Sequence, residues 1–365
     1  MRIGIITFHA SHNYGSMLQA WALQTYLQEK GHEVEIVNYR SNIQKIIYHK
    51  PLSLARMDVA LASVKRLLLY PASIKSLYKK WHLFEDFLHQ ELNLSKECES
   101  YSELEDDTYD YELLICGSDQ IWNTNAPDSG EIYYGNWFKG RKISYAASMG
   151  QYPEKCDQKF LRKQIKGFYK ISVREERTKR FLIDNGIAND VSVVCDPTLL
   201  LDAEQYDALA GDEPLVKGDY VFFYTPVGMP HEYFSIASDI GRKIGCRVIT
   251  EKAYYPKDIK RYGNIEKYLP TGPKEFLNLI KFAKCVCGGS FHLQVFSILF
   301  KKNFYCINGD RDSRTNHLLK QLGLQRRIIS LDVTHGIDSF EIHDYDEVFV
   351  RIGLMRRDSN CFLEI

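Results

Sequence analysis

The sequence lacks the marks of several common protein classes. Its 365 residues carry no net charge, because 47 acidic side chains balance 47 basic ones. A general nucleic-acid binder carries a basic excess, so no nucleic-acid partner is expected. No stretch reaches the ~18 uninterrupted apolar residues of a membrane-spanning helix. The apolar run at residues 3–8 is too short for a signal peptide and is typical of a first strand. We therefore expect a cytoplasmic protein.

Metal and cofactor signatures are also missing. The nine cysteines are scattered without a framework spacing, which indicates reduced thiols. Cys285 and Cys287 form a CxC pair, but no second pair lies near them in the sequence to complete a zinc site. Neither GxGxxG nor GxxxxGKS/T occurs, which argues against nicotinamide and ATP. We expect neither a metal nor a cofactor.

The sequence does contain a repeated alternation of strand and helix patterns. Residues 3–8 predict a strand, residues 16–30 a helix that ends at Gly31, and residues 33–39 a second strand. This βαβ pattern predicts a parallel sheet with right-handed crossovers. The pattern restarts with predicted strands at 220–224, 246–250, 284–287 and 303–307. We therefore predict an α/β protein with two doubly wound, Rossmann-like domains that face a cleft.

The predicted domains divide the chain near residues 201–216, where 212–214 is typical of a linker. The N-terminal domain covers residues 1–205 and carries a helical insertion at 44–92. The C-terminal domain covers residues 206–335. Residues 336–365 are expected to pack back on the N-terminal domain.

Ligands of doubly wound sheets bind at the carboxyl ends of the strands. That rule selects four loops, at 9–15, 117–123, 172–175 and 288–293. In the last loop, Gly288 and Gly289 permit a tight turn. Ser290 is a good N-cap, which places His292 in the first turn of a helix behind the core residue Phe291. His292 then either meets an anion at the helix start or merely caps the helix or bonds a carbonyl.

The other loops allow two interpretations each. Arg174 directly follows a strand and can fork onto a carboxylate or phosphate, or can pair locally with Glu175 and Glu176. The segment 117–123 suits a sugar, with polar groups and one aromatic face, or is an Asx turn beside a core tryptophan. The segment 9–16 could bind an anion or hydroxyls at the start of the first helix.

Residues 50–80 hold seven basic side chains against one acid, Asp58. A basic amphipathic helix can lie on an anionic membrane, at the inner face of the membrane for a cytoplasmic protein. The alternative interpretation is a solvated helical face.

Read together, these segments resemble the polysaccharide pyruvyl transferase family. The resemblance runs from residue 2 to about 330 and depends on the order and spacing of its motifs. The matching stretches are ITFHASHNYGSMLQAWALQTYLQEKGHEVEIVNYR at 6–40, LLICGSDQIWN at 113–123, KISYAASMG at 142–150, ISVREE at 171–176, VVCDPTLLL at 193–201 and CVCGGSFHLQVFSILF at 285–300.

The resemblance implies a GT-B-like arrangement of the two domains. It implies phosphoenolpyruvate as donor, bound by the C-terminal domain, and a sugar of a surface polysaccharide precursor, such as a capsule or exopolysaccharide, as acceptor. The acceptor is a free sugar, for example galactose, or a lipid-linked oligosaccharide on the side of the N-terminal domain. The products are a cyclic pyruvate ketal and phosphate.

The implied site residues follow from this chemistry. His292 is the candidate general acid, Arg174 holds a donor anion, and Asp119 accepts the hydroxyl proton. The donor side comprises Gly288, Gly289, Ser290, Phe291, Arg174, Arg311 and Arg314. The acceptor side comprises Asn13, Tyr14, Gly15, Gly117, Ser118, Asp119 and Trp122.

Two positions depart from the family pattern. Some members carry Arg where this chain has Ser290, so Arg174, Arg311 or Arg314 must supply the missing cation. Close relatives usually have Gly where this chain has Leu293. Two other functions stay open: a nucleotide-sugar-dependent glycosyltransferase of the GT-B type, and a non-catalytic glycan-binding or assembly protein.

Overall fold

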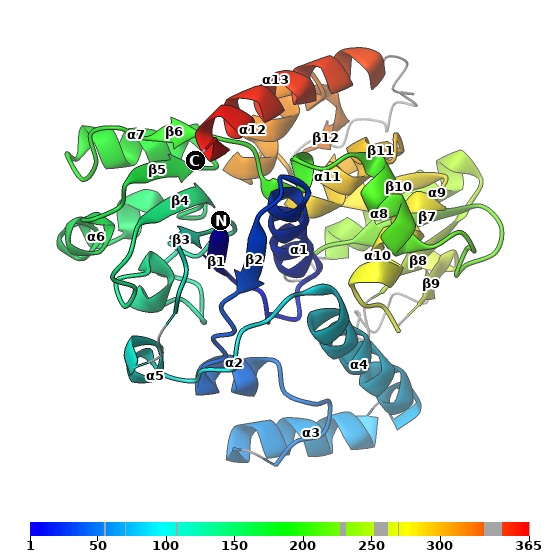
Figure 1. Cartoon of the computed structure of the whole chain (residues 1–365). Helices are drawn as coiled ribbons and strands as arrows, with labels where there is room; N and C mark the ends of the chain where they lie inside the picture. Colours follow the sequence, from blue (N-terminus) through cyan, green and yellow to red (C-terminus); the bar gives the residue numbers. More distant parts are fainter. Residues whose placement is uncertain are drawn as a thin grey trace.

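Two six-stranded parallel sheets form the framework of the protein (Figure 1). The computed structural model describes residues 1–54, 56–69, 71–106, 109–226, 231–251, 262–268, 270–331 and 345–364. The N-terminal sheet has the order β2-β1-β3-β4-β5-β6, and the C-terminal sheet the order β12-β11-β10-β7-β8-β9. The predicted α/β fold with two doubly wound domains is confirmed.

The strands of the N-terminal sheet are β1 (Arg2–Ile6), β2 (Glu33–Ile36), β3 (Leu113–Cys116), β4 (Lys142–Ala147), β5 (Lys170–Val173) and β6 (Ser192–Val193). Those of the C-terminal sheet are β7 (Tyr220–Tyr224), β8 (Arg247–Thr250), β9 (Ile265–Lys267), β10 (Cys285–Gly288), β11 (Asn303–Ile307) and β12 (Ile328–Ile329). The short edge strands β9 and β12 were absent from the sequence-based prediction, because two or three residues give no measurable alternation.

Helices cover the sheets. The first half of the chain contributes α1 (Tyr14–Glu29), α2 (Asn42–Ile47), α3 (Met57–Leu69), α4 (Ile74–Glu91), α5 (Tyr101–Asp106), α6 (Gln158–Ile165), α7 (Glu176–Asp184) and α8 (Ala203–Ala210). The second half contributes α9 (His231–Ile244), α10 (Pro273–Lys281), α11 (Phe291–Leu299), α12 (Ser313–Gln321) and α13 (Tyr345–Leu363). Helix α8 occupies part of the predicted linker region and contacts α10 of the C-terminal half. No helix in the described parts of the chain is long and apolar enough to cross a membrane.

The topology selects one place for a ligand. In the N-terminal sheet, β2 and β3 flank β1 on opposite sides, so the chain changes direction between β1 and β3. In the C-terminal sheet, β8 and β10 flank β7, so the change lies between β7 and β10. Ligands of such sheets bind outside the strand ends at these switch points.

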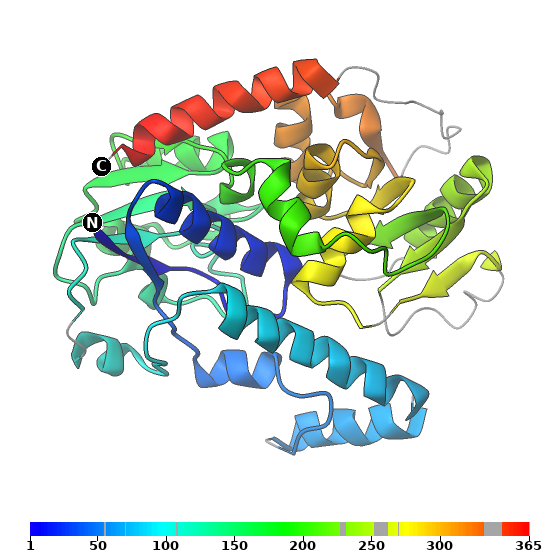
Figure 2. The ribbon, with the colours of Figure 1, turned by 45° about the vertical axis from the view of Figure 1, so that its right-hand side comes forward.

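Helix α1 lies between the two sheets and joins their cores (Figures 1 and 2). One buried apolar cluster contains Ile5 of β1, Met17 of α1 and Phe222 of β7. Tyr14, at the start of α1, stacks on Phe276 of α10 with ring centroids 4.4 Å apart. The domains therefore share an apolar contact behind the switch points.

Helix α13 crosses from the C-terminal half to the N-terminal sheet (Figure 1). At its first residue, Tyr345 donates a hydrogen bond to the carbonyl of Lys302, and near its end Ser359 accepts one from the N–H of Cys195 at 2.9 Å. Residues 332–344, which precede it, lie outside the described part of the chain. The exact boundaries at 205 and 335 stay predictions.

Candidate functional site

A cavity of about 440 Å³ opens where the two switch points meet. Its walls come from the loops after β1, β3, β7 and β10, the strand ends that the topology selects. The lining residues are Phe8, Ser11, Asn13, Ser16, Tyr48, Asp119, Gln120, Asn123, Asn125, Ala126, Pro127, Asp128, Pro226, Gly289, Ser290, Phe291, His292 and Arg314. Three of the four predicted loops meet there, and only the loop at 172–175 does not line this cavity.

The turn before α11 holds His292 at the cavity. Gly288 has a φ of 151°, and a Cβ at this position would overlap the carbonyl oxygen of Tyr224, so glycine is required. Ser290 caps α11 by accepting a hydrogen bond from the N–H of Leu293 at 3.4 Å. His292 therefore lies in the first helical turn, as the sequence predicts. Leu293 is fully buried and packs into the core.

The start of α1 touches the imidazole ring from the other domain. Asn13 caps α1 by accepting hydrogen bonds from the N–H groups of Gly15 and Ser16. A Cβ on Gly15 would collide with Nδ1 of His292. Gly15 is thus needed because its backbone lies directly against the His292 side chain.

Asp196 joins His292 to Arg174. Its Oδ2 atom lies 3.5 Å from Nε2 of His292 and accepts a hydrogen bond from Nη1 of Arg174 at 2.6 Å. Thr198 donates from its N–H and its hydroxyl to Oδ1. Burial alone would raise the pKa of Asp196, but His292, Arg174 and Thr198 outweigh it and hold this pKa well below its usual range. The carboxylate therefore stays charged.

Sequence reasoning missed Asp196. Like Arg174, Asp196 is a charged residue at the carboxyl end of a strand, and this position could have identified it. Asp196 follows β6, but the pair Asp196-Pro197 reads first as the end of a strand, and no sequence pattern links it to a histidine 96 positions later.

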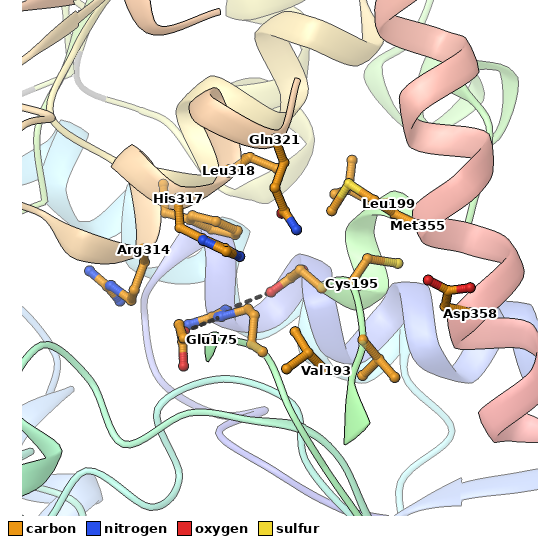
Figure 3. A pocket seen from close by; sticks show the side chains of 14 residues that line it. Glu175, Val193, Cys195, Leu199, Arg314, His317, Leu318, Gln321, Met355 and Asp358 are labelled. Atoms are coloured by element: carbon orange, nitrogen blue, oxygen red, sulfur yellow. Dashed lines mark hydrogen bonds and ion pairs between the residues drawn. The ribbon is translucent and has the colours of Figure 1, made fainter. Parts of the chain in front are cut away.

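Arg174 is buried inside the protein rather than exposed at the cavity. It donates to Glu175 at 2.9 Å and to Asp196, and its guanidinium lies 4.8 Å from the centre of the Phe291 ring. It lines a smaller cavity of about 70 Å³, between α12 and α13 (Figure 3). The expectation that Arg174 grips the donor stays a prediction, because two carboxylates engage its Nε and Nη1 but its Nη2 has no hydrogen-bond partner among the described residues. We treat it as a residue that positions Asp196.

Arg314 is the predicted cation that reaches the larger cavity. It lines both cavities and pairs with Asp312 through Nε and Nη2, at 3.0 and 2.9 Å. Arg311 is exposed, lines neither cavity, and accepts a hydrogen bond from Gln151 on its carbonyl. Among the three predicted cations, only Arg314 lines the cavity that His292 lines.

Asp119 faces the same cavity from the N-terminal domain. Its Oδ2 accepts a hydrogen bond from the Ser16 hydroxyl, and its Oδ1 accepts one from the N–H of Gln120 at 2.8 Å. These donors fix the carboxylate at the mouth of the β1–β3 switch point. The structure thus brings Asp119, Asn13 and His292 together.

Four predicted acceptor residues lie elsewhere. Trp122 is fully buried and stacks on Tyr134 with centroids 5.4 Å apart, because the loop turns its ring into the core. Ser118 is also fully buried and donates to the carbonyl of Ala146. Gly117 has a φ of 139° and only shapes the turn. These three residues do not line the cavity.

Tyr14 is the fourth predicted acceptor residue that does not line the cavity. Its ring is buried against Phe276, and its hydroxyl donates to Glu251 at 3.1 Å and to the carbonyl of Thr271. Tyr14 therefore belongs to the contact between domains and has no surface for a sugar.

A second carboxyl group in the cavity was not predicted. Asp128 lies on the same wall as Asp119, and the hydroxyl of Tyr48 donates to its Oδ2 at 3.4 Å. Burial and the charge of Asp119 raise the pKa of Asp128. No motif in the sequence marks this residue, since its approach to Asp119 depends on the path of the loop after β3.

The described residues contain no group of three or more His, Cys, Asp or Glu side chains that could hold a metal ion. The expectation of a metal-free site stays a prediction.

Several solved structures are similar to this one in fold. A putative UDP-N-acetylglucosamine 2-epimerase from Listeria monocytogenes has 8% identity and a TM-score of 0.50, over 98% of this chain and 89% of that one. The UDP-GlcNAc 2-epimerase from Methanocaldococcus jannaschii has 13% identity and a TM-score of 0.47, over 98% and 93% of the two chains. The E. coli heptosyltransferase WaaC has 12% identity and a TM-score of 0.43, over 90% and 92%. These likenesses concern the fold alone, which is GT-B-like.

The family is assigned from the sequence. A comparison with curated protein sequences finds no match. The family profile described as polysaccharide pyruvyl transferase matches residues 13–311, which include Asn13, Asp119, Asp196 and His292. Because that match spans most of the chain, the protein belongs to the polysaccharide pyruvyl transferase family and is a transferase.

Proposed function

We propose that the protein transfers the pyruvyl group of phosphoenolpyruvate to a sugar of a surface polysaccharide precursor, forming a cyclic ketal and releasing phosphate. The single observation that carries the proposal is the placement of His292 at the interdomain cavity, backed by the charged carboxylate of Asp196. A buried carboxylate behind a histidine orients the imidazole and stabilises its protonated form.

The proposed first step is a proton transfer from His292 to the methylene carbon of the donor. The two ring nitrogens have different surroundings, because Nε2 is buried beside Asp196 and Nδ1 lies against the backbone of Gly15. Protonation makes C2 of the donor electrophilic, and a sugar hydroxyl forms a bond to it. The C2–O bond to phosphate then breaks, and a second hydroxyl of the same sugar closes the ketal. Each hydroxyl releases one proton: one balances the proton added to carbon and restores His292, and the other leaves with the phosphate.

The donor's negative charges need partners at the same place. The helices α1 and α11 both begin at the cavity, and the positive ends of their dipoles favour an anion. Arg314 adds a cation that lines the same cavity. We propose that these groups hold the phosphate and carboxylate in place of the Arg that some family members carry at the position of Ser290.

The acceptor is proposed to lie on the wall that carries Asp119 and Asp128. The Asp119 carboxylate, held by Ser16 and Gln120, is the candidate to take the proton of the attacking hydroxyl. Asp128, whose pKa is raised by burial and by the charge of Asp119, is proposed to supply a second carboxyl group for the sugar hydroxyls. Galactose as the sugar, a lipid-linked acceptor and the position of the ketal are part of this proposal.

The experiment is transfer from phosphoenolpyruvate to a panel of galactosides and other sugars, followed by phosphate release and by mass spectrometry of the product. In D2O the new methyl group should carry one deuterium from solvent. A thermal-shift screen with phosphoenolpyruvate and nucleotide sugars supplies the second arm. Stabilisation and turnover with a nucleotide sugar, but not with phosphoenolpyruvate, would favour a glycosyltransferase. Sugar binding without turnover of any donor would favour a non-catalytic glycan-binding protein.

A further inference from the structure

Helix α3 has an apolar face that the fold leaves uncovered. Its buried side carries Val59 and Ser63, and the Ser63 hydroxyl donates to the carbonyl of Val59. The opposite side is exposed and apolar. Its residues and exposed fractions are Met57 (82%), Leu61 (67%), Val64 (50%) and Leu68 (73%). This i, i+4, i+7, i+11 spacing places the four side chains on one stripe of the helix, which we call the α3 stripe.

Further exposed apolar side chains adjoin the α3 stripe in the sequence. Leu54 precedes the helix, and Leu67 and Leu69 end it, each about half exposed or more. Both views of the ribbon place α3 at the periphery of the molecule, beyond α2 and α4 (Figures 1 and 2). A protein that leaves so many leucines together in water normally uses them to bind something.

Basic side chains occur on α3 itself and on the adjoining part of α4, although Lys80 of this segment is paired with Glu251. The segment 50–80 carries a formal excess of six positive charges, in a chain whose total is zero. Lys65 on α3 is exposed, as are Lys75 and Lys79 on the adjoining start of α4. The one acid of the segment, Asp58, pairs with Arg56. An exposed apolar stripe on a helix that also carries the exposed Lys65, in a segment with a basic excess, complements an anionic lipid surface, where leucines enter the acyl boundary and lysines meet the headgroups.

A second copy of this chain fits the same face less well. A symmetric dimer through α3 would place the stripe and its lysines against the same groups of the other copy. Like charges would then face each other, whereas an anionic bilayer offers the opposite charge. The face is also a protruding helix, which a fluid lipid surface accepts without a matching groove.

The insertion that carries α3 is tied to the cavity. Tyr48, just after α2, lines the cavity wall. Glu85 of α4 accepts a hydrogen bond from His12, in the loop after β1, at 2.8 Å. A surface bound through α3 is therefore connected through short contacts to the mouth of the site.

From these observations we propose that the α3 stripe docks the protein on an anionic lipid bilayer. The proposal concerns this surface alone, and its test requires no turnover. The full chain is sedimented with vesicles of phosphatidylglycerol and phosphatidylcholine in equal parts, and with vesicles of phosphatidylcholine alone. We expect binding to the anionic vesicles that weakens as salt is added, and little binding to the neutral ones.

Matched variants separate the stripe from exposure in general. The double variant L61S/L68S should bind anionic vesicles at least about tenfold more weakly. The control V350S/L354S removes two exposed apolar residues, at the same kind of spacing, from α13 and should bind as the wild type does. Likewise K65E/K75E should weaken binding, whereas K159E/K163E on α6 should not. Phosphate release with a soluble acceptor should be unchanged in L61S/L68S.

Three results would overturn the proposal. One is wild-type protein that ignores anionic vesicles, and another is L61S/L68S that binds them as the wild type does. The third is a dimer of the wild type in sedimentation velocity that L61S/L68S abolishes, without vesicle binding, which would assign the face to a second copy. Circular dichroism of each variant checks that it is folded, so that loss of binding is not loss of structure.

Discussion

Nε2 of His292 faces Oδ2 of Asp196 across 3.5 Å, and the two residues belong to different halves of the chain. Asp196 follows the last strand of the N-terminal sheet, whereas His292 begins a helix of the C-terminal sheet. The pair exists only when both domains are packed together. The environment of the proposed proton donor therefore depends on the packing of the two domains.

Replacing the carboxylate should disable the histidine without displacing it. In Asp196→Asn, the amide can no longer stabilise a protonated imidazole, so we expect kcat to fall by about a hundredfold or more. The donor KM should change little, because Asp196 lies behind His292 rather than on the cavity wall. Steady-state phosphate release across the pH range measures both parameters. The exposed Asp190 supplies the control, and if Asp190→Asn lost as much activity, the role of Asp196 would not be specific.

Gly15→Ala should damage activity although it adds a good helix former. In an ordinary helix this change stabilises by about 1 kcal/mol. Here the new Cβ would collide with Nδ1 of His292, so we expect a large fall in kcat. Gly353→Ala in α13 is the matched control, since a Cβ there meets nothing within 4 Å. Wild-type rates in Gly15→Ala would show that catalysis does not depend on the observed position of the His292 ring.

Variants of Trp122 and Asp119 should distinguish an effect on stability from an effect on acceptor binding or turnover. Trp122→Phe shrinks a fully buried side chain, so the free energy of unfolding should fall by about 1–3 kcal/mol while the acceptor KM stays constant. Asp119→Asn should lower kcat or raise the acceptor KM with a smaller loss of stability. Denaturant unfolding and acceptor titrations give the two readouts. A raised acceptor KM in Trp122→Phe would restore the tryptophan to the site.

Glu85 should make the free energy of unfolding depend on pH in the acid range. Burial alone would raise the pKa of Glu85, but hydrogen bonds from His12 and Arg40 lower it from 4.5 to about 2. A carboxyl whose pKa is lower in the folded state stabilises the protein above its unfolded pKa, here 4.5, and loses this effect as the pH falls toward 2.

The unfolding free energy of the wild type should therefore drop more between neutral pH and about pH 3 than that of Glu85→Gln. Asp86→Asn, an exposed neighbour on α4, should follow the wild type. Equal pH dependence in wild type and Glu85→Gln would remove the ion pair from the account of stability.

The parts of this site that depend on neighbouring residues in the chain could be predicted from the sequence. Strand–loop–helix alternation predicted the two sheets, and two glycines before Ser290 placed His292 at a helix start, since these signals lie within a few residues. The direction of a loop side chain is a tertiary property, so Trp122 and Tyr14 were assigned to the site but lie in the core. Asp196 and Asp128 were missed because their partners come from segments far away in the chain.

The central claim is that His292 donates the proton that starts pyruvyl transfer. The most direct test is the rate of phosphate release from phosphoenolpyruvate, in the presence of a sugar acceptor, by the wild type and by folded His292→Gln. We predict acceptor-dependent release by the wild type and a fall of at least about a hundredfold in the variant. A His292→Gln protein that releases phosphate and forms the ketal at the wild-type rate would contradict the account.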